Sequence, residues 1–181
     1  MNTLILFGSP RKEGNTIQLV NAFAQALKEK GANVRMLYLN DMNIRPCQGC
    51  GVCLPNGVCR INDDMKDIRK YILESDLIVY ATPVYWFSIS GQLKLVIDRT
   101  FAFMDENYNS RVAGKKAVTI MTCGTENVKE CEHIITMFKM IFDLQKIEYA
   151  GNIIATGCNP GAVSIKNEFI EKSRELAKSL I

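Results

Sequence analysis

Residues 3–16 read TLILFGSPRKEGNT, and this stretch decides the fold class. Its first five residues form a nearly continuous apolar run that Gly8 ends, which is typical of a strand buried on both faces of a parallel sheet. From Asn15 onward the apolar residues recur with helical spacing as far as Gly31. We therefore expect a strand, a turn and a helix, with Asn15 as the N-cap and Gly31 as the C-terminal stop.

The same alternation of strand and helix continues along the chain. It produces a parallel sheet with right-handed crossovers and helices on both faces. The sequence therefore predicts an α/β, flavodoxin-like three-layer sandwich with a five-stranded parallel sheet of order 2-1-3-4-5, whose ligand crevice lies between strands one and three. The remaining strands are predicted at 34–39, 77–81, 117–122 and 147–156, and the remaining helices at 65–74 (capped by Asp63 or Asp64), from Ser90, at 128–142 and at 162–180.

The composition is that of a globular protein of one domain. The chain has 181 residues, of which 48% are hydrophobic and 23% charged, and this length buries roughly 70% of the unfolded surface. A net charge of +3 is too small to imply a nucleic-acid partner. Because no run approaches the ~18 apolar residues of a membrane span, we expect a cytoplasmic protein without a membrane or nucleic-acid partner. We expect a single domain over residues 1–181, with a cysteine-rich loop at about 45–62.

The turn after the first predicted strand suits a phosphate. Backbone N–H groups and the positive end of the helix dipole favour an anion there, and Ser9, Arg11 and Thr16 add side-chain donors. The turn has neither the Gly-Lys-Ser/Thr ending of a Walker A loop nor the G-x-G-x-x-G of dinucleotide binding, so a terminal phosphomonoester fits best. The alternative is a well-capped turn without a ligand.

Residues 82–88, TPVYWFS, follow the third predicted strand. Three consecutive aromatic residues, including the only Trp, stand at the carboxyl end of a central strand and indicate a flat ligand on which they stack. The alternative is that they pack beneath the following helix. The turn at 122–125 offers a third wall. Lys94 and Asp98, with Arg99 beside them, are interpreted as a structural charge pair.

Four of the seven cysteines lie within 13 residues, which indicates metal or redox chemistry. The C-x2-C-x2-C run is the one that opens ferredoxin cluster loops, and one short loop can wrap a cubane cluster in this way. Structural zinc more often uses two well-separated pairs. Three interpretations stay open, an iron–sulfur cluster, zinc and free thiols, because spacing selects a metal only in context. The four are Cys47, Cys50, Cys53 and Cys59.

A phosphate-binding turn and an aromatic wall at one crevice suit flavin mononucleotide (FMN). The motifs at 8–11, 14–16 and 83–86, with Lys94-x3-Asp98-Arg99, resemble the NADPH-dependent FMN reductase branch of the flavodoxin-like superfamily. The cysteine motif resembles that of the iron–sulfur flavoproteins, which pair FMN with a [4Fe-4S] cluster. The resemblance implies that Ser9, Arg11, Asn15 and Thr16 hold the phosphate, that Pro83, Val84, Tyr85 and Trp86 line the ribityl chain and ring, that Gly124 borders the ring, and that Cys47, Cys50, Cys53 and Cys59 hold the cluster.

We therefore expect an FMN-dependent oxidoreductase that moves electrons between a one-electron donor and a two-electron acceptor through FMN and a [4Fe-4S] cluster. Its redox partner is expected to be ferredoxin or NAD(P)H. Because the cysteine loop leaves an edge strand, the cluster is expected to meet the flavin of a neighbouring subunit in a homodimer or homotetramer. The alternatives are an NAD(P)H-dependent FMN or quinone reductase without a cluster and a zinc-stabilised flavin-binding module.

We expect no catalytic side chain, because the cofactors carry the chemistry. The sole histidine, His133, is expected at the surface. Cys123, Cys131 and Cys158 are expected to be packing residues, with contact to the flavin as an alternative for Cys123.

Overall fold

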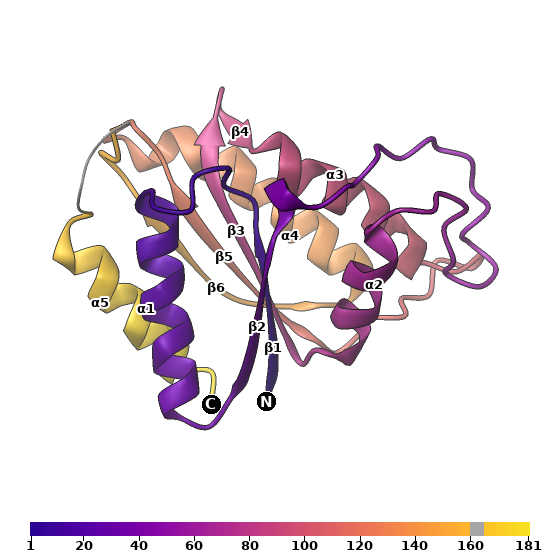
Figure 1. Ribbon diagram of the computed structural model, residues 1–181, viewed down its shortest axis with the longest axis horizontal. Helices are drawn as coiled ribbons and strands as arrows, with labels where there is room; N and C mark the ends of the chain where they lie inside the picture. Colours follow the sequence, from indigo (N-terminus) through magenta and orange to yellow (C-terminus); the bar gives the residue numbers. More distant parts are fainter. Residues whose placement is uncertain (160–164) are drawn as a thin grey trace.

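The computed structural model describes residues 1–159 and 165–181 (Figure 1). Within these residues a five-stranded parallel sheet has the order β2-β1-β3-β5-β6, which corresponds to the predicted order 2-1-3-4-5. A short sixth strand, β4, pairs antiparallel with the end of β3 and was not predicted. The bounds are β1 (Asn2–Phe7), β2 (Asn33–Tyr38), β3 (Leu77–Tyr85), β4 (Ser88–Ile89), β5 (Lys116–Thr122) and β6 (Glu148–Ala155).

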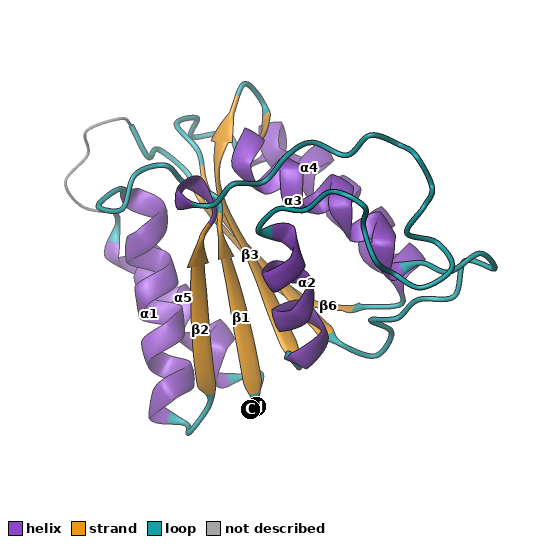
Figure 2. Cartoon of the chain, turned by 45° about the vertical axis from the view of Figure 1, so that its right-hand side comes forward, coloured by secondary structure: helices purple, strands orange, loops and turns teal. Residues whose placement is uncertain are grey.

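Helices cover both faces of the sheet and complete three layers (Figure 2). One face carries α1 (Asn15–Glu29) and α5 (Asn167–Lys178). The other carries α2 (Met65–Glu74), α3 (Gly91–Arg99) and α4 (Glu132–Gln145). Short 3-10 helices lie at Leu39–Asp41, Thr100–Phe103 and Val128–Cys131. In the described part of the chain, no helix combines the length and the apolar character needed to cross a membrane.

Alternate residues of β1 serve two separate cores, one on each face of the sheet. Leu4 and Leu6 pack on the side of α2, α3 and α4, whereas Ile5 and Phe7 pack on the side of α1 and α5. All four side chains are at most 1% exposed, and burying each of them contributes about 1.5–3 kcal/mol. A strand buried on both faces needs apolar residues at successive positions, which explains the uninterrupted run that opens the sequence.

The structure corrects three predicted boundaries. Gly14 rather than Asn15 is the N-cap of α1, with an extended backbone (φ −88°, ψ −170°). The third strand continues past its predicted end at residue 81 to Tyr85, because its last residues pair with β4. The helix predicted at 162–180 is α5, which begins at Asn167; residues 160–164 lie outside the described residues.

Candidate cofactor site and cysteine loop

The turn between β1 and α1 presents the open amino end of a helix. No side chain among the described residues caps α1, and its first turn carries no acidic residue. The first N–H groups of a helix have no partners within the helix, so an uncapped end without a nearby carboxylate favours an anion. The structure thus places an uncapped helix end, which favours an anion, at the carboxyl end of β1, where the sequence predicts a phosphate site.

Three of the predicted phosphate ligands occupy this turn in different ways. Ser9 is buried, and its Oγ accepts the backbone N–H of Arg11 at 3.1 Å. Arg11 itself is exposed. The buried hydroxyl of Thr16 shares a 2.7 Å hydrogen bond with the hydroxyl of Thr122 at the end of β5. When Thr122 is the donor in that pair, Thr16 keeps its own proton for a ligand oxygen.

Asn15 has a buried polar atom that is available to a ligand. Its Oδ1 is buried and has no hydrogen-bond partner among the described residues, while its Nδ2 donates to the Asn159 carbonyl at 3.5 Å. A buried polar atom without a partner costs about 1–3 kcal/mol, so native proteins rarely leave one unless a ligand or water completes it. An amide can present either its oxygen or its nitrogen at such a position. Asn15 therefore fits a role as a polar contact for a bound phosphate.

The end of β3 turns into β4 through a hairpin whose two turn residues are aromatic. Tyr85 pairs with Ser88, and Trp86 and Phe87 between them have φ of +46° and +60°. This is the pattern of a type I′ turn, which Asn and Gly usually supply because bulky residues are strained there. Trp86 is 93% exposed. Strained backbone that displays apolar rings to solvent is typical of a ligand site.

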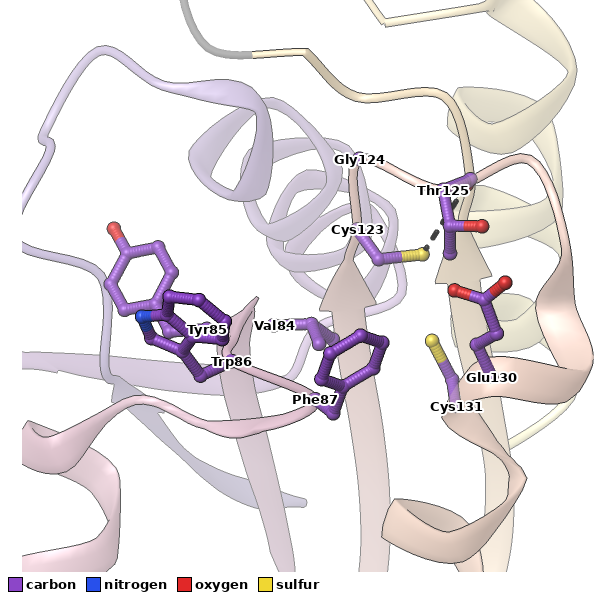
Figure 3. Close-up of a pocket in the computed structure, with 9 residues that line it drawn as sticks. All are labelled: Val84, Tyr85, Trp86, Phe87, Cys123, Gly124, Thr125, Glu130 and Cys131. Carbon is purple, nitrogen blue, oxygen red and sulfur yellow. Dashed lines mark hydrogen bonds between the residues drawn. The ribbon is translucent and has the colours of Figure 1, made fainter.

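The hairpin forms one wall of a cavity of about 670 Å³ (Figure 3). The volume and the largely apolar lining suit a small organic ligand. The predicted residues Val84, Tyr85, Trp86 and Gly124 line the cavity. Pro83 does not; it is buried within the sheet, where it pairs with Thr122. The opposite wall consists of the turn after β5 and the 3-10 helix that precedes α4, with Cys123, Gly124, Thr125, Glu130 and Cys131.

Sequence reasoning missed a contact that positions the hairpin. His133 is exposed, as predicted, but its ring Nε2 is hydrogen-bonded to the Phe87 carbonyl oxygen. Because a carbonyl only accepts, His133 donates here. A residue 46 positions away along the chain thus connects α4 to the hairpin turn.

The expectation that Cys123, Cys131 and Cys158 pack inside the protein is confirmed for Cys123 and Cys131, which are 3% and 1% exposed; Cys158 is half-buried. Burial, together with the adjoining thiol of Cys131, raises the pKa of Cys123 to about 12. Burial likewise raises the pKa of Cys158. The thiols of Cys123 and Cys158 therefore stay protonated at neutral pH.

The cysteine loop, residues 45–62, leaves β2 and extends beside α2 and α3 (Figures 1 and 2). Arg99 connects the two ends of this loop. Its guanidinium pairs with Asp63 through both nitrogens, at 2.9 and 3.1 Å, and donates to the Arg45 carbonyl at 2.8 Å. Asp63 also accepts the Arg45 N–H at 2.9 Å. One buried guanidinium from α3 thus joins the start of the loop to its end.

Two more arginines lie beneath the middle of the loop. Arg111 donates to the carbonyls of Leu54 (2.8 Å) and Pro55 (3.1 Å). Gly57, with φ +75°, lies so close to Arg69 that a Cβ added there would be 2.9 Å from its Nη2. The Nε atoms of Arg69 and Arg99 are buried without partners among the described residues. Positive charge beneath a loop of thiols stabilises thiolates and the anionic centres that they form.

The four loop thiols are not gathered into a metal site. Cys47 and Cys50 are exposed, and Cys53 and Cys59 are half-buried. Over residues 1–159 and 165–181, no three His, Cys, Asp or Glu side chains are arranged to hold a metal ion. Burial raises the pKa of Cys53, and the thiols of the other three add to the rise, so the four lie within electrostatic reach. In their chemistry, four thiols beside the arginine side chains fit a thiolate-ligated centre.

Comparison with known proteins agrees with this geometry. An iron–sulfur flavoprotein from Archaeoglobus fulgidus is 28% identical over 99% of this chain and 79% of its own length. A second, from Methanocaldococcus jannaschii, is 40% identical over 55% of this chain and 52% of its own length. A Bacillus subtilis protein described as a putative NAD(P)H-dependent FMN-containing oxidoreductase is 26% identical over 98% of this chain and 97% of its own.

Solved structures support the fold. An NAD(P)H:quinone oxidoreductase from Methanothermobacter marburgensis superimposes with a TM-score of 0.78 at 19% identity, over 99% of this chain and 96% of that one. Residues 1–147 match a family described as NADPH-dependent FMN reductase. The chain is therefore an FMN-dependent oxidoreductase that belongs to the NADPH-dependent FMN reductase family, and several of its relatives are described as iron–sulfur flavoproteins.

Proposed function

We propose that this protein transfers electrons between a one-electron donor and a two-electron acceptor, using FMN in the aromatic-walled cavity and a [4Fe-4S] cluster on the cysteine loop. The observation that carries the proposal is the placement of an uncapped helix end and an aromatic-walled cavity at the carboxyl ends of neighbouring strands β1, β3 and β5. In flavodoxin-like sheets this edge is where a flavin binds.

In this proposal the phosphate of FMN binds at the amino end of α1. The N–H groups of the first helical turn, the hydroxyls of Ser9 and Thr16, the amide of Asn15 and the guanidinium of Arg11 supply its donors. Val84, Tyr85, Trp86 and Gly124 face the ribityl chain and ring, and Pro83 supports that wall from within the sheet. When bound, FMN supplies exchange of one or two electrons, and the protein orients it and excludes water.

The cysteine loop supplies the one-electron centre. Cys47, Cys50, Cys53 and Cys59 would ligate a [4Fe-4S] cluster, and Arg99 and Arg111 fix the backbone of the loop that carries them. The loop lies beside α2 and α3, whereas the cavity lies at the end of β3 and β5 (Figures 1 and 3). We therefore also propose that the cluster serves the flavin of a second copy, in a homodimer or homotetramer, with ferredoxin or NAD(P)H as the electron donor.

The test is purification without oxygen, followed by an absorption spectrum and by counts of iron, sulfide, zinc and FMN per chain. About four iron and four sulfide beside one FMN establish the proposal. One FMN with zinc, or with neither metal nor sulfide after anaerobic reconstitution, overturns the cluster. Absence of FMN overturns the assignment of the cavity.

One observation favours a second candidate, an NAD(P)H-dependent FMN or quinone reductase without a cluster: the loop thiols are not gathered into a metal site in the described residues. Rapid mixing of the FMN-loaded protein with NADPH and NADH separates the two. Bleaching of the flavin within the mixing time, in protein without iron, favours the reductase. Slow bleaching by nicotinamides and fast bleaching by reduced ferredoxin favour the electron-transfer protein.

A further inference from the structure

Cys123 and Cys131 meet in the wall of the cavity, although neither belongs to the cysteine loop. Cys123 directly follows β5 and Cys131 is the N-cap of α4. Figure 3 shows both sulfur atoms in the space beside the Phe87 ring. Both line the cavity, both side chains are almost completely buried, and the Cys131 thiol lies near enough to Cys123 to raise its pKa.

Cys158, the half-buried third cysteine outside the loop, is oriented differently. Cys158 donates to the Ala155 carbonyl at 3.5 Å and packs with the core on the side of α1 and α5. It is not among the residues that line the cavity. Of the three cysteines outside the loop, Cys123 and Cys131 are the two that line the cavity.

We propose that Cys123 and Cys131 are a redox-active dithiol, which a two-electron acceptor that enters the cavity converts to a disulfide. Two S–H bonds break and one S–S bond forms, and the two electrons and two protons pass to the acceptor. A dithiol reductant returns them and reverses the change. The inference goes beyond the proposed function and depends on neither FMN nor a cluster, because it concerns only this chain's own thiols.

The disulfide would connect the end of β5 directly to the start of α4. The segment between them, 124–130, supplies Gly124, Thr125 and Glu130 to the cavity wall. Two residues beyond Cys131, His133 holds the carbonyl of the hairpin residue Phe87. Oxidation of this pair therefore acts on both walls of the same cavity.

The test is a disulfide map of the intact, folded protein treated with diamide, an azo compound that accepts two electrons and two protons from two thiols. Unreacted thiols are then alkylated in denaturant and the chain is cut with trypsin. Trypsin places the cysteines of interest on different peptides. Cys123 lies in peptide 117–129, Cys131 in 130–139, Cys158 in 147–166 and all four loop cysteines in 36–60.

We expect peptides 117–129 and 130–139 to be joined, with a mass two hydrogen atoms below their sum, and to separate with dithiothreitol. Cys158→Ala should keep this crosslink, whereas Cys131→Ala should abolish it. Recovery of both peptides separately and alkylated, in samples where 36–60 is oxidised, overturns the proposal. So does a crosslink of 117–129 to 147–166. Diamide applied in urea is the control for fold dependence, and it should give mixed pairings. The wild-type map decides the question even if a variant fails to fold.

Discussion

Arg99 and Asp63 form a bidentate ion pair whose side chains are 2% and 0% exposed. The two residues come from the end of α3 and the segment just before α2, 36 positions apart. Through Arg45, which bonds to both, the pair closes the base of the cysteine loop. Two buried charges that neutralise each other tolerate the loss of neither partner, because the remaining charge stays buried and uncompensated.

Replacing Asp63 by Asn is therefore expected to lower the free energy of unfolding by about 3–5 kcal/mol, measured by urea denaturation. The matched control is Asp98→Asn. Asp98 pairs with Lys94 at 2.5 Å on the same helix as Arg99, but both side chains are about half exposed, so this change should cost less than about 1 kcal/mol. Equal losses in the two variants would contradict the assigned role of the buried pair.

The same pair predicts a pH dependence. Burial by itself would raise the pKa of Asp63, but hydrogen bonds from Arg99 and Arg45 and the charge of Arg99 lower it below its usual value. A carboxyl with a lowered folded-state pKa stabilises the fold above its unfolded pKa of about 3.9, and this contribution disappears as pH falls through the folded value. Urea midpoints measured from pH 7 down to the acid transition should decline below about pH 4 in the wild type. The decline should be shallower in Asp63→Asn. Parallel plots of urea midpoint against pH in the two proteins would show that Asp63 does not cause the pH dependence.

The central sheet was predictable because its strands are continuous apolar runs, and a parallel strand buried on both faces needs such a run. The hairpin that ends β3 was not. A two-residue type I′ turn is usually recognised in a sequence by Asn-Gly or Asp-Gly. Here Trp86 and Phe87 occupy the turn instead. The aromatic residues predict a ligand site, but nothing in their sequence predicts the turn that exposes them.

For the site, the sequence supplied residue types and loops but not which side chains meet. Lys94 and Asp98 were predicted to pair because they are four apart on one helix, and they do. Arg99 next to them binds Asp63, a contact that exists only once α2 and α3 lie on one face. Cys123 and Cys131 similarly meet because α4 begins beside the end of β5, which no periodicity reveals.

Arg11→Ala is expected to weaken FMN binding. A charge-assisted hydrogen bond to a phosphate contributes about 1.5–3 kcal/mol, so the dissociation constant should rise roughly 10- to 100-fold. The measurement is titration of apoprotein with FMN, followed by quenching of FMN fluorescence. Lys12→Ala removes the adjacent charge, which pairs with Asp41 instead, and should change the constant little. If both variants raised the FMN dissociation constant equally, net charge rather than a direct contact from Arg11 would account for the effect.

Thr16→Val tests the same site from the helix side. It should also weaken FMN retention, but it leaves the buried Thr122 hydroxyl without its partner, so a stability loss of about 1–3 kcal/mol should accompany it. FMN content is therefore measured well below the unfolding temperature of the variant. Unchanged FMN content in both Arg11→Ala and Thr16→Val would place the phosphate elsewhere.

Trp86 gives a prediction with opposite signs for stability and binding. Its left-handed backbone favours glycine, so Trp86→Gly should leave the free energy of unfolding unchanged or raise it by up to about 1 kcal/mol. FMN affinity should fall, because an aromatic wall of the cavity is lost. Trp86→Ala is the matched control: it loses the same ring and keeps the strained conformation, so affinity falls without a gain in stability. In the wild type, emission from this sole Trp should be quenched on adding FMN.

Cys50→Ala is expected to remove iron from anaerobically prepared protein while FMN remains bound at one per chain. Cys50 is exposed in the loop and lines no part of the aromatic-walled cavity, so its sulfur contributes to a metal centre but not to the flavin site. The matched control is Cys158→Ala, which deletes a half-buried thiol outside the loop and should retain iron and FMN alike. Iron retained in Cys50→Ala, or lost equally in Cys158→Ala, would show that the loop thiols are not the ligands. Parallel loss of FMN in Cys50→Ala would show instead that the loop and the cavity fold as one unit.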